Sequence, residues 1–155
     1  MNATIRLGLS SVLLMVAGGL SAYAPAAFAQ TSQIRNVGIT GRCLTYVDLG
    51  GTSHYARNAT CNAGDAKQIW TQVPVGGGYF LLKNVATGRC LASAQTAQGL
   101  NIRSCDPALW THQWQRTATG TTFFKSRASG RYLFALAGGG VGISVSTGSV
   151  QTWQY

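Results

Sequence analysis

The chain of 155 residues contains twelve Lys and Arg but only three acidic residues, all of them Asp, and its formal net charge is +9. Three carboxylates leave little material for a glycosidase that needs a matched carboxylate pair. The positive charge predicts attraction to anionic partners, whereas its scattered distribution along the chain argues against specific nucleic-acid binding.

Residues 1–29 have the pattern of a secretory signal peptide. A short segment with one positive charge, Arg6, precedes an apolar stretch over residues 7–20, and Ala27-Phe28-Ala29 forms a small-residue cleavage site. The apolar stretch is too short, and too interrupted by Gly, to cross a bilayer as a helix. We therefore expect cleavage, export to the periplasm or beyond, no membrane span, and one domain over residues 30–155.

Two landmarks recur three times in residues 30–155, a Gly-Arg turn and a downstream Trp. They are Gly41-Arg42, Gly88-Arg89 and Gly130-Arg131 for the turn, and Trp70, Trp114 and Trp153 for the tryptophan. The turn glycines lie 47 and 42 residues apart, and the tryptophans 44 and 39 residues apart. This common period predicts three structural repeats, at approximately 32–72, 78–116 and 121–155.

Each repeat reads as short β-strands separated by turns. Segments such as residues 100–103 alternate between apolar and polar side chains, and helix signals are absent. Gly138-Gly139-Gly140 lacks the Lys of a phosphate-binding loop and predicts a hairpin turn. Propellers use four to eight blades, so three such units predict an all-β, pseudo-threefold β-trefoil.

An even number of cysteines in an exported chain predicts two disulfide bonds. The four residues are Cys43, Cys61, Cys90 and Cys105. Four cysteines allow three pairings, and their spacing alone does not choose among them. No C-x-x-C is present and the two histidines lie far apart in sequence, so we expect neither a metal nor another cofactor.

The repeats resemble ricin-B-type lectin domains, in which a G-[RK]-C-L turn is paired with a terminal Q-x-W. Gly88-Arg89-Cys90-Leu91 and Gln68-Ile69-Trp70 carry the likeness, which covers residues 34–155. Trefoil subunits of cytolethal distending toxins resemble the same repeats. The resemblance implies a β-trefoil, disulfides Cys43–Cys61 and Cys90–Cys105, and a structural role in the core for the three repeat tryptophans.

In the lectins, sugar is held by an Asp, an aromatic residue and an Asn-Gln pair at set places in each repeat. Those places hold Thr45, Ala59, Lys67 and Gln68 in the first repeat, Ala92, Arg103, Thr111 and His112 in the second, and Phe134, Ser144, Val150 and Gln151 in the third. No repeat has the full set, so the resemblance does not imply ordinary galactose binding. Gln68, Arg103, His112 and Gln151 remain candidate ligand-binding residues.

Further candidates lie in the first repeat. Asp48, Tyr55 and Arg57, with Tyr46 and His54 nearby, would frame a shifted sugar pocket in a turn-rich segment, or else form a solvated loop with half-buried rings. Likewise, four aromatic residues of the second and third repeats would form either an exposed patch for a partner or part of the core. They are Trp110, Phe123, Phe124 and Phe134.

No catalytic motif is present, since the cysteines are expected to be paired and neither histidine has a nucleophile motif around it. We therefore expect a secreted, non-catalytic module that binds carbohydrates or glycoconjugates, anionic ones included. The alternative is a receptor-binding or delivery subunit of a multi-component bacterial toxin, with an effector subunit as partner. A trefoil protease inhibitor is a third possibility, but the chain has no identifiable reactive loop.

Overall fold

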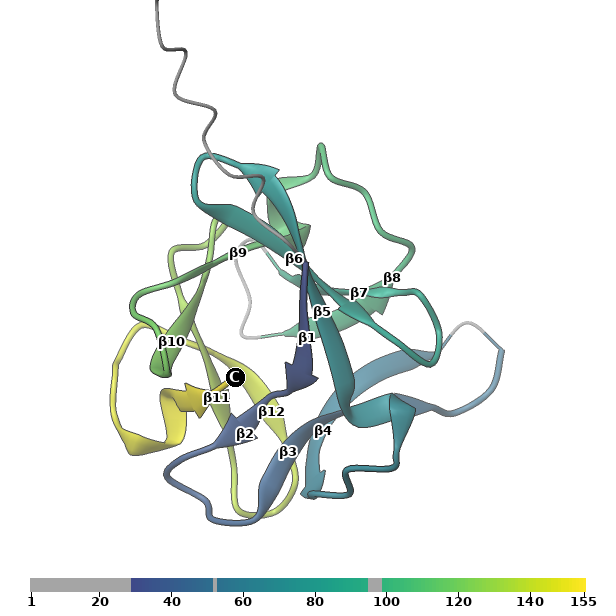
Figure 1. Cartoon of the computed structure of the whole chain (residues 1–155), viewed down its shortest axis with the longest axis vertical. Coiled ribbons are helices and arrows are strands. Elements are labelled where there is room, and N and C mark those ends of the chain that lie inside the picture. Colours follow the sequence, from purple (N-terminus) through teal and green to yellow (C-terminus); the bar gives the residue numbers. More distant parts are fainter. Residues whose placement is uncertain (1–28, 52, 95–98) are drawn as a thin grey trace, which may run out of the picture.

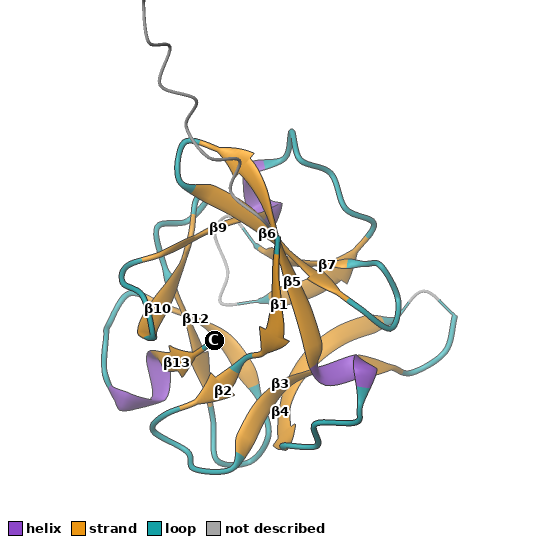
Figure 2. Cartoon of the chain, viewed as in Figure 1, coloured by secondary structure: helices purple, strands orange, loops and turns teal. Residues whose placement is uncertain are grey.

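Thirteen short antiparallel β-strands form the molecule in the computed structural model, which describes residues 29–51, 53–94 and 99–155 (Figures 1 and 2). The strands are β1 (Gln30–Gln33), β2 (Arg35–Asn36), β3 (Arg42–Asp48), β4 (His54–Thr60), β5 (Ile69–Gly76), β6 (Tyr79–Asn84), β7 (Cys90–Ser93), β8 (Leu100–Arg103), β9 (Gln113–Arg116), β10 (Thr121–Ser126), β11 (Tyr132–Ala135), β12 (Val141–Ser144) and β13 (Thr152–Gln154). The expected signal peptide, residues 1–29, lies outside the described residues except for Ala29. No helix among the described residues is long and apolar enough to cross a membrane.

The strand pairing closes a six-stranded barrel. β1 pairs with β5 and β2 pairs with β13, so these two short strands together act as one barrel strand that joins the two ends of the sheet. The path β5–β6–β9–β10–β13 completes the ring. Three hairpins, β3–β4, β7–β8 and β11–β12, each pair with one barrel strand, namely β2, β6 and β10. This arrangement is the β-trefoil that the repeats predict.

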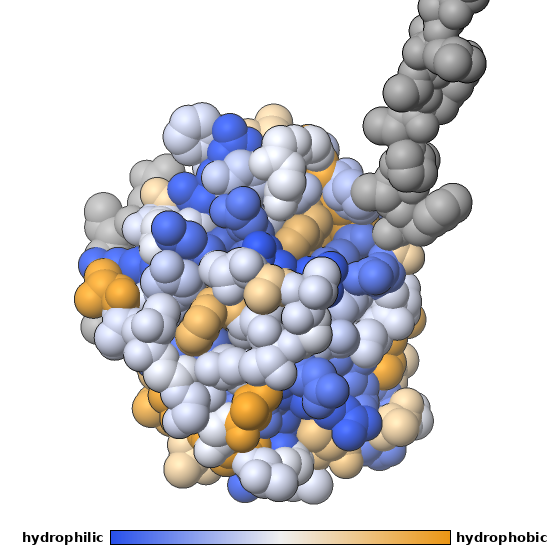
Figure 3. Space-filling model, turned by 60° about the vertical axis from the view of Figure 1, so that its left-hand side comes forward, coloured by the Kyte–Doolittle hydropathy of each residue, from blue (hydrophilic) through white to orange (hydrophobic). Residues whose placement is uncertain are grey.

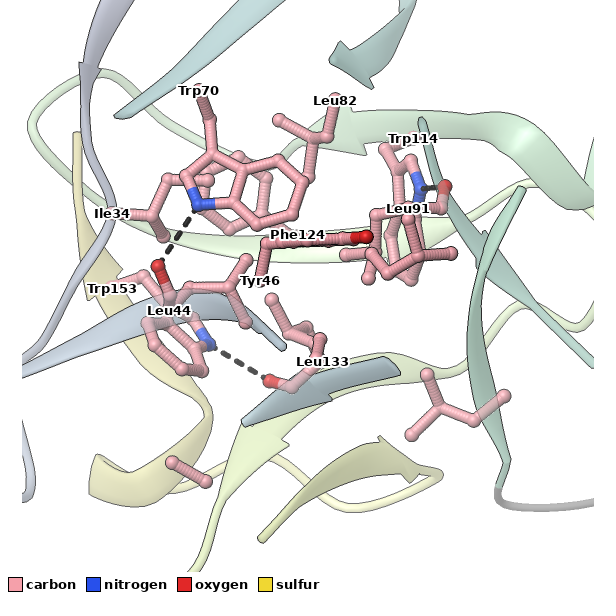
Figure 4. Packing of buried hydrophobic residues seen from close by; sticks show 14 of the residues in the cluster. Ile34, Leu44, Tyr46, Trp70, Leu82, Leu91, Trp114, Phe124, Leu133 and Trp153 are labelled. Atoms are coloured by element: carbon pink, nitrogen blue, oxygen red, sulfur yellow. Dashed lines mark hydrogen bonds between the residues drawn. The ribbon is translucent and has the colours of Figure 1, made fainter. Parts of the chain in front are cut away.

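A hydrogen bond connects the tryptophan of each repeat to the strand that follows its Gly-Arg turn. The indole N–H groups of Trp70, Trp114 and Trp153 donate to the carbonyl oxygens of Leu44, Leu91 and Leu133 over 2.9, 2.9 and 3.0 Å (Figure 4). All three indoles are fully buried, as expected of core residues. A buried indole needs a partner for its N–H, so the tryptophan requires the strand that follows the Gly-Arg turn.

The turn glycines have backbone conformations that other residues rarely adopt. Gly41, Gly88 and Gly130 have φ values of 71°, 67° and 67°, in the left-handed region. The structure confirms both expected disulfides, Cys43–Cys61 and Cys90–Cys105, with Cα atoms 5.0 and 4.9 Å apart. It also confirms the hairpin turn at residues 138–140, which joins β11 to β12.

Short helical turns are the feature that the sequence does not predict. One turn of 3₁₀ helix lies immediately before each strand that contains a core tryptophan. These turns are η1 (Ala66–Gln68), η2 (Trp110–His112) and η3 (Ser149–Gln151). Three residues are too few to produce a helical hydrophobic period, so pattern analysis finds no helix there. These turns contain three of the candidate ligand-binding residues, Gln68, His112 and Gln151.

The four aromatic residues considered as a patch are not equivalent. Phe124 is fully buried in the barrel, and Phe123 and Phe134 are half-buried. Trp110 is 57% exposed. An aromatic patch made of all four is therefore not present, and only Trp110 of this set offers a largely exposed ring.

Gly38 provides a test of the packing between the first and third repeats. A Cβ placed on Gly38 would lie 2.4 Å from the carbonyl carbon of Ser149 and 2.7 Å from the nitrogen of Val150, so the backbone of η3 would have to move. We expect Gly38→Ala to lower the free energy of unfolding by about 1–3 kcal/mol, measured by urea denaturation. Gly138→Ala is the control, since a Cβ there meets nothing within 4 Å. An equal loss in both variants would contradict this packing.

Candidate functional site

A groove of about 810 Å³ lies where the first repeat meets the second. The strands β4 and β8 pack against each other there, so the end of the β3–β4 hairpin forms one side and the segment from β8 to η2 forms the other. The polar side chains that line it are His54, Arg89, Asn101, Arg103, Ser104, Asp106 and His112. The groove therefore depends on the packing of two repeats and is not contained in either one.

Tyr46, Asp48 and His54 build the first side of the groove. The Tyr46 hydroxyl lies 2.9 Å from Nδ1 of His54, and Oδ1 of Asp48 lies 3.4 Å from the same nitrogen. Oδ1 of Asp48 also accepts a hydrogen bond from the backbone N–H of Gly50 over 2.8 Å. Burial raises the pKa of the Tyr46 phenol above 10.0; the nearby Asp48 raises it further, and Arg89 opposes the shift. This side is thus held together by its own hydrogen bonds.

The segment that carries these residues differs from the expected turn-rich stretch. Asp48 ends β3 and pairs with His54 at the start of β4, so most of the segment is a regular hairpin. Successive residues of a strand point to opposite sides of the sheet. Tyr55 and Arg57 are therefore directed away from His54, and Arg57 lies beside Gly139 of the third repeat. The structure does not gather Asp48, Tyr55 and Arg57 around one pocket.

Arg89, Arg103 and Asp106 build the second side. Within the described part of the chain, Asp48 pairs with His54, and neither Arg89 nor Arg103 forms an ion pair with a carboxylate. Oδ1 of Asp106 accepts a hydrogen bond from the backbone N–H of Ala108 over 2.9 Å, which engages this carboxylate in its own turn. The guanidinium groups therefore remain available to a ligand.

His112 lines the groove although it is only 2% exposed. Its Nδ1 lies 3.1 Å from the backbone nitrogen and 3.2 Å from the carbonyl oxygen of Asp106, while Nε2 is buried without a hydrogen-bond partner. In either neutral tautomer, the Asp106 backbone satisfies Nδ1 and Nε2 stays unpaired. A buried polar atom without a partner costs about 1–3 kcal/mol, which makes His112 unusual for a purely structural residue.

The remaining two candidates, Gln68 and Gln151, are buried in their 3₁₀ turns. Oε1 of Gln68 accepts from the backbone N–H of Asn62 over 2.7 Å and from Nε2 of Gln33 over 3.1 Å, and its Nε2 donates to the carbonyl of Thr60 over 2.8 Å. Both ends of this amide are therefore engaged within the chain. Gln151 is 8% exposed in η3. The side chain of Gln68 therefore holds the turn that precedes Trp70.

Of the seven candidates, the groove thus gathers Arg103 and His112, and Asp48 behind His54. Arg89, Asn101 and Asp106 are groove residues that sequence reasoning missed. Arg89 belongs to a Gly-Arg turn that recurs in all three repeats. This repetition indicates a structural role, so sequence analysis does not reveal that Arg89 also lines a groove. The asymmetry between the repeats was the available signal, because Arg103 has Ala59 and Ser144 as its counterparts.

A second, more apolar groove of about 710 Å³ lies between the β5–β6 hairpin and the loop that follows β9, with Pro74, Tyr79, Phe80 and Arg116 among its lining residues. Nearby, the Arg127 guanidinium stacks on the Tyr79 and Trp110 rings at 4.6 and 4.5 Å from their centroids. On the face shown in Figure 3, hydrophobic residues form small separate spots on a mostly hydrophilic surface. This face therefore has no broad apolar patch.

The chain matches one protein family over most of its length. The family model "Cytolethal distending toxin A/C domain" matches residues 19–122. This chain belongs to the cytolethal distending toxin A/C family. No curated protein matches this family member in sequence.

Solved structures share the fold of this toxin-family chain. The Haemophilus ducreyi cytolethal distending toxin is 19% identical, with 80% of this chain and 81% of that chain covered and a TM-score of 0.66. The Polyporus squamosus lectin, solved with the epitope Neu5Aca2-6Galb1-4GlcNAc, is 16% identical over 81% of this chain, with a TM-score of 0.70. The match spans 48% of that lectin chain, about half its length. The designed threefold-symmetric protein ThreeFoil is 23% identical, with 80% and 96% covered and a TM-score of 0.64. Identities this low establish the β-trefoil alone.

Proposed function

We propose that this chain is a secreted, non-catalytic cell-binding subunit of a multi-component toxin, and that it binds cell-surface glycans in the groove between its first and second repeats. The observation that carries the proposal is the position of Arg103 and His112. Both occupy places that the lectin resemblance assigns to sugar binding, and both line the groove. A polar, preformed groove of this kind suits the hydroxyl-rich surface of a sugar.

The carboxylates support a non-catalytic role. Each of the three accepts a hydrogen bond from the backbone N–H two residues further on: Asp48 from Gly50, Asp65 from Lys67, and Asp106 from Ala108. A local turn motif explains this recurring contact. A glycosidase instead needs two carboxyl groups facing each other across a sugar, and these three lie in separate turns.

A glycan array probed with the exported protein, with both disulfides formed, tests glycan binding. The proposal predicts binding to at least one class of glycan, and binding to cells that display it. The absence of binding across the array and to cells would overturn it.

Assembly with an effector subunit is tested separately. Co-expression with the proteins encoded beside it should yield a complex that survives size-exclusion chromatography. The exposed Leu109 and Trp110, which are adjacent in sequence, provide apolar surface for such a contact. If the chain stays monomeric when it is co-expressed with the proteins encoded beside it, the toxin-subunit part of the proposal is contradicted. Glycan binding is not affected by that result.

A further inference from the structure

The groove between the first and second repeats is lined by two guanidinium groups and one carboxylate, so its formal charge is positive. Its carboxylate, Asp106, and the adjacent Asp48 already accept hydrogen bonds from backbone N–H groups of their own turns. Arg89 and Arg103, by contrast, have guanidinium groups without an ion-pair partner among the described residues. A guanidinium offers five N–H donors and no acceptor, so the groove favours a ligand rich in acceptors.

His112 adds one more unpaired polar atom to the lining of the groove. Its Nε2 is buried and has no hydrogen-bond partner within the chain, so it can contact a polar group of a ligand. The chain as a whole has a net charge of +9, which strengthens the positive potential at any groove where basic groups are not neutralised. This positive charge favours negative charge on the ligand.

The pseudo-threefold symmetry shows that this combination is local. Arg42 and Arg131 occupy the turn positions that correspond to Arg89, yet neither lines the groove. The position of Arg103 is filled by alanine and serine in the other repeats. Among the described residues, only the second repeat has an arginine at both of these corresponding positions.

We propose that the groove selects an acidic glycan, with a carboxylate or sulfate group bound by Arg89 and Arg103. Paired, bidentate contacts with such planar or tetrahedral anions are what a guanidinium makes best. This inference rests on the proposed glycan binding and adds the chemical class of the ligand. Neutral parts of the glycan would extend along Asn101 and the rest of the groove.

Matched pairs of immobilised glycans test the inference: sialylated chains beside their desialylated forms, and sulfated chains beside their unsulfated forms. We expect the wild-type protein to bind at least one acidic member about tenfold more tightly than its neutral partner, because the neutral partner lacks the charged hydrogen bonds to the arginines. Raising the salt from about 0.1 M to about 1 M should weaken this binding, because it shortens the screening length. The two pairs of glycans separate carboxylate from sulfate recognition.

Arg89→Gln and Arg103→Gln should each lower the affinity for the acidic glycan by about tenfold. Arg42→Gln is the matched control, because it removes the same charge from the equivalent turn outside the groove. Equal binding of acidic and neutral glycans, or a loss caused by Arg42→Gln instead of the groove variants, would overturn the inference while glycan binding itself stands. Failure to bind any glycan would overturn both.

Discussion

Replacing Trp114 with alanine is expected to lower the free energy of unfolding by about 3–5 kcal/mol, the usual result of removing a fully buried large aromatic side chain. The Trp114 ring is completely buried, and its indole N–H donates to the carbonyl of Leu91 over 2.9 Å. The substitution opens a cavity in the barrel and leaves this carbonyl without its partner. A loss of this size is a large fraction of the stability of a domain.

Trp110→Ala is the matched control for this prediction. Trp110 lies four residues earlier, in η2, and is 57% exposed with Arg127 stacked on its ring at 4.5 Å. Loss of an exposed cation–π contact costs about 0.5–1 kcal/mol. Urea unfolding of both variants should therefore separate them by at least about 2 kcal/mol. Similar losses in the two variants would contradict the core role of Trp114.

Removing the second disulfide, by Cys90→Ala together with Cys105→Ala, should cost about 3 kcal/mol of stability according to the chain-entropy estimate for a loop of this length. The two residues are 15 positions apart, and the bond connects the start of β7 to the segment after β8. Chemical unfolding with and without the substitutions measures the effect. A loss below about 1 kcal/mol would show that hairpin packing alone holds this repeat.

The same double variant should also affect binding. Cys105 lines the groove next to Asp106, and Arg103 precedes it by two residues. Loss of the covalent link frees this segment to move, so the groove is no longer held in its binding geometry. We expect weaker glycan binding at temperatures where the variant is still folded. The comparison is the corresponding double variant of Cys43 and Cys61. These two residues are 18 positions apart and lie at the end of the β3–β4 hairpin that does not line the groove.

The fold was largely predictable because its defining contact is local within each repeat. The carbonyl of Leu91, just after the Gly-Arg turn, accepts the indole N–H of Trp114, and both the turn and the tryptophan can be recognised in the sequence. Closure of the barrel has no comparable pattern in the sequence. It depends on Ile34 dividing the first barrel strand between β5 and β13, a contact between the two ends of the chain.

The candidate site was only partly predictable, because a motif gives the position of a residue without its direction. Gln68 occupies a place used for sugar in the lectins, yet its amide is turned inward and engaged by the chain. Tyr55 and Arg57 are close to His54 in sequence but lie on the opposite side of β4. Arg89 and Arg103 lie at the same end of the β7–β8 hairpin, but His54 joins them only through the packing of two repeats, which no spacing within one repeat can show.

A crystal structure of the protein with the glycan that binds most tightly on the array would test the central claim most directly. The account predicts the ligand in the groove between β4 and β8, with its acidic group in contact with Arg89 and Arg103 and with His112 beneath it. A ligand bound at the second groove, beside Phe80 and Arg116, or at the corresponding places of the first or third repeat, would contradict it.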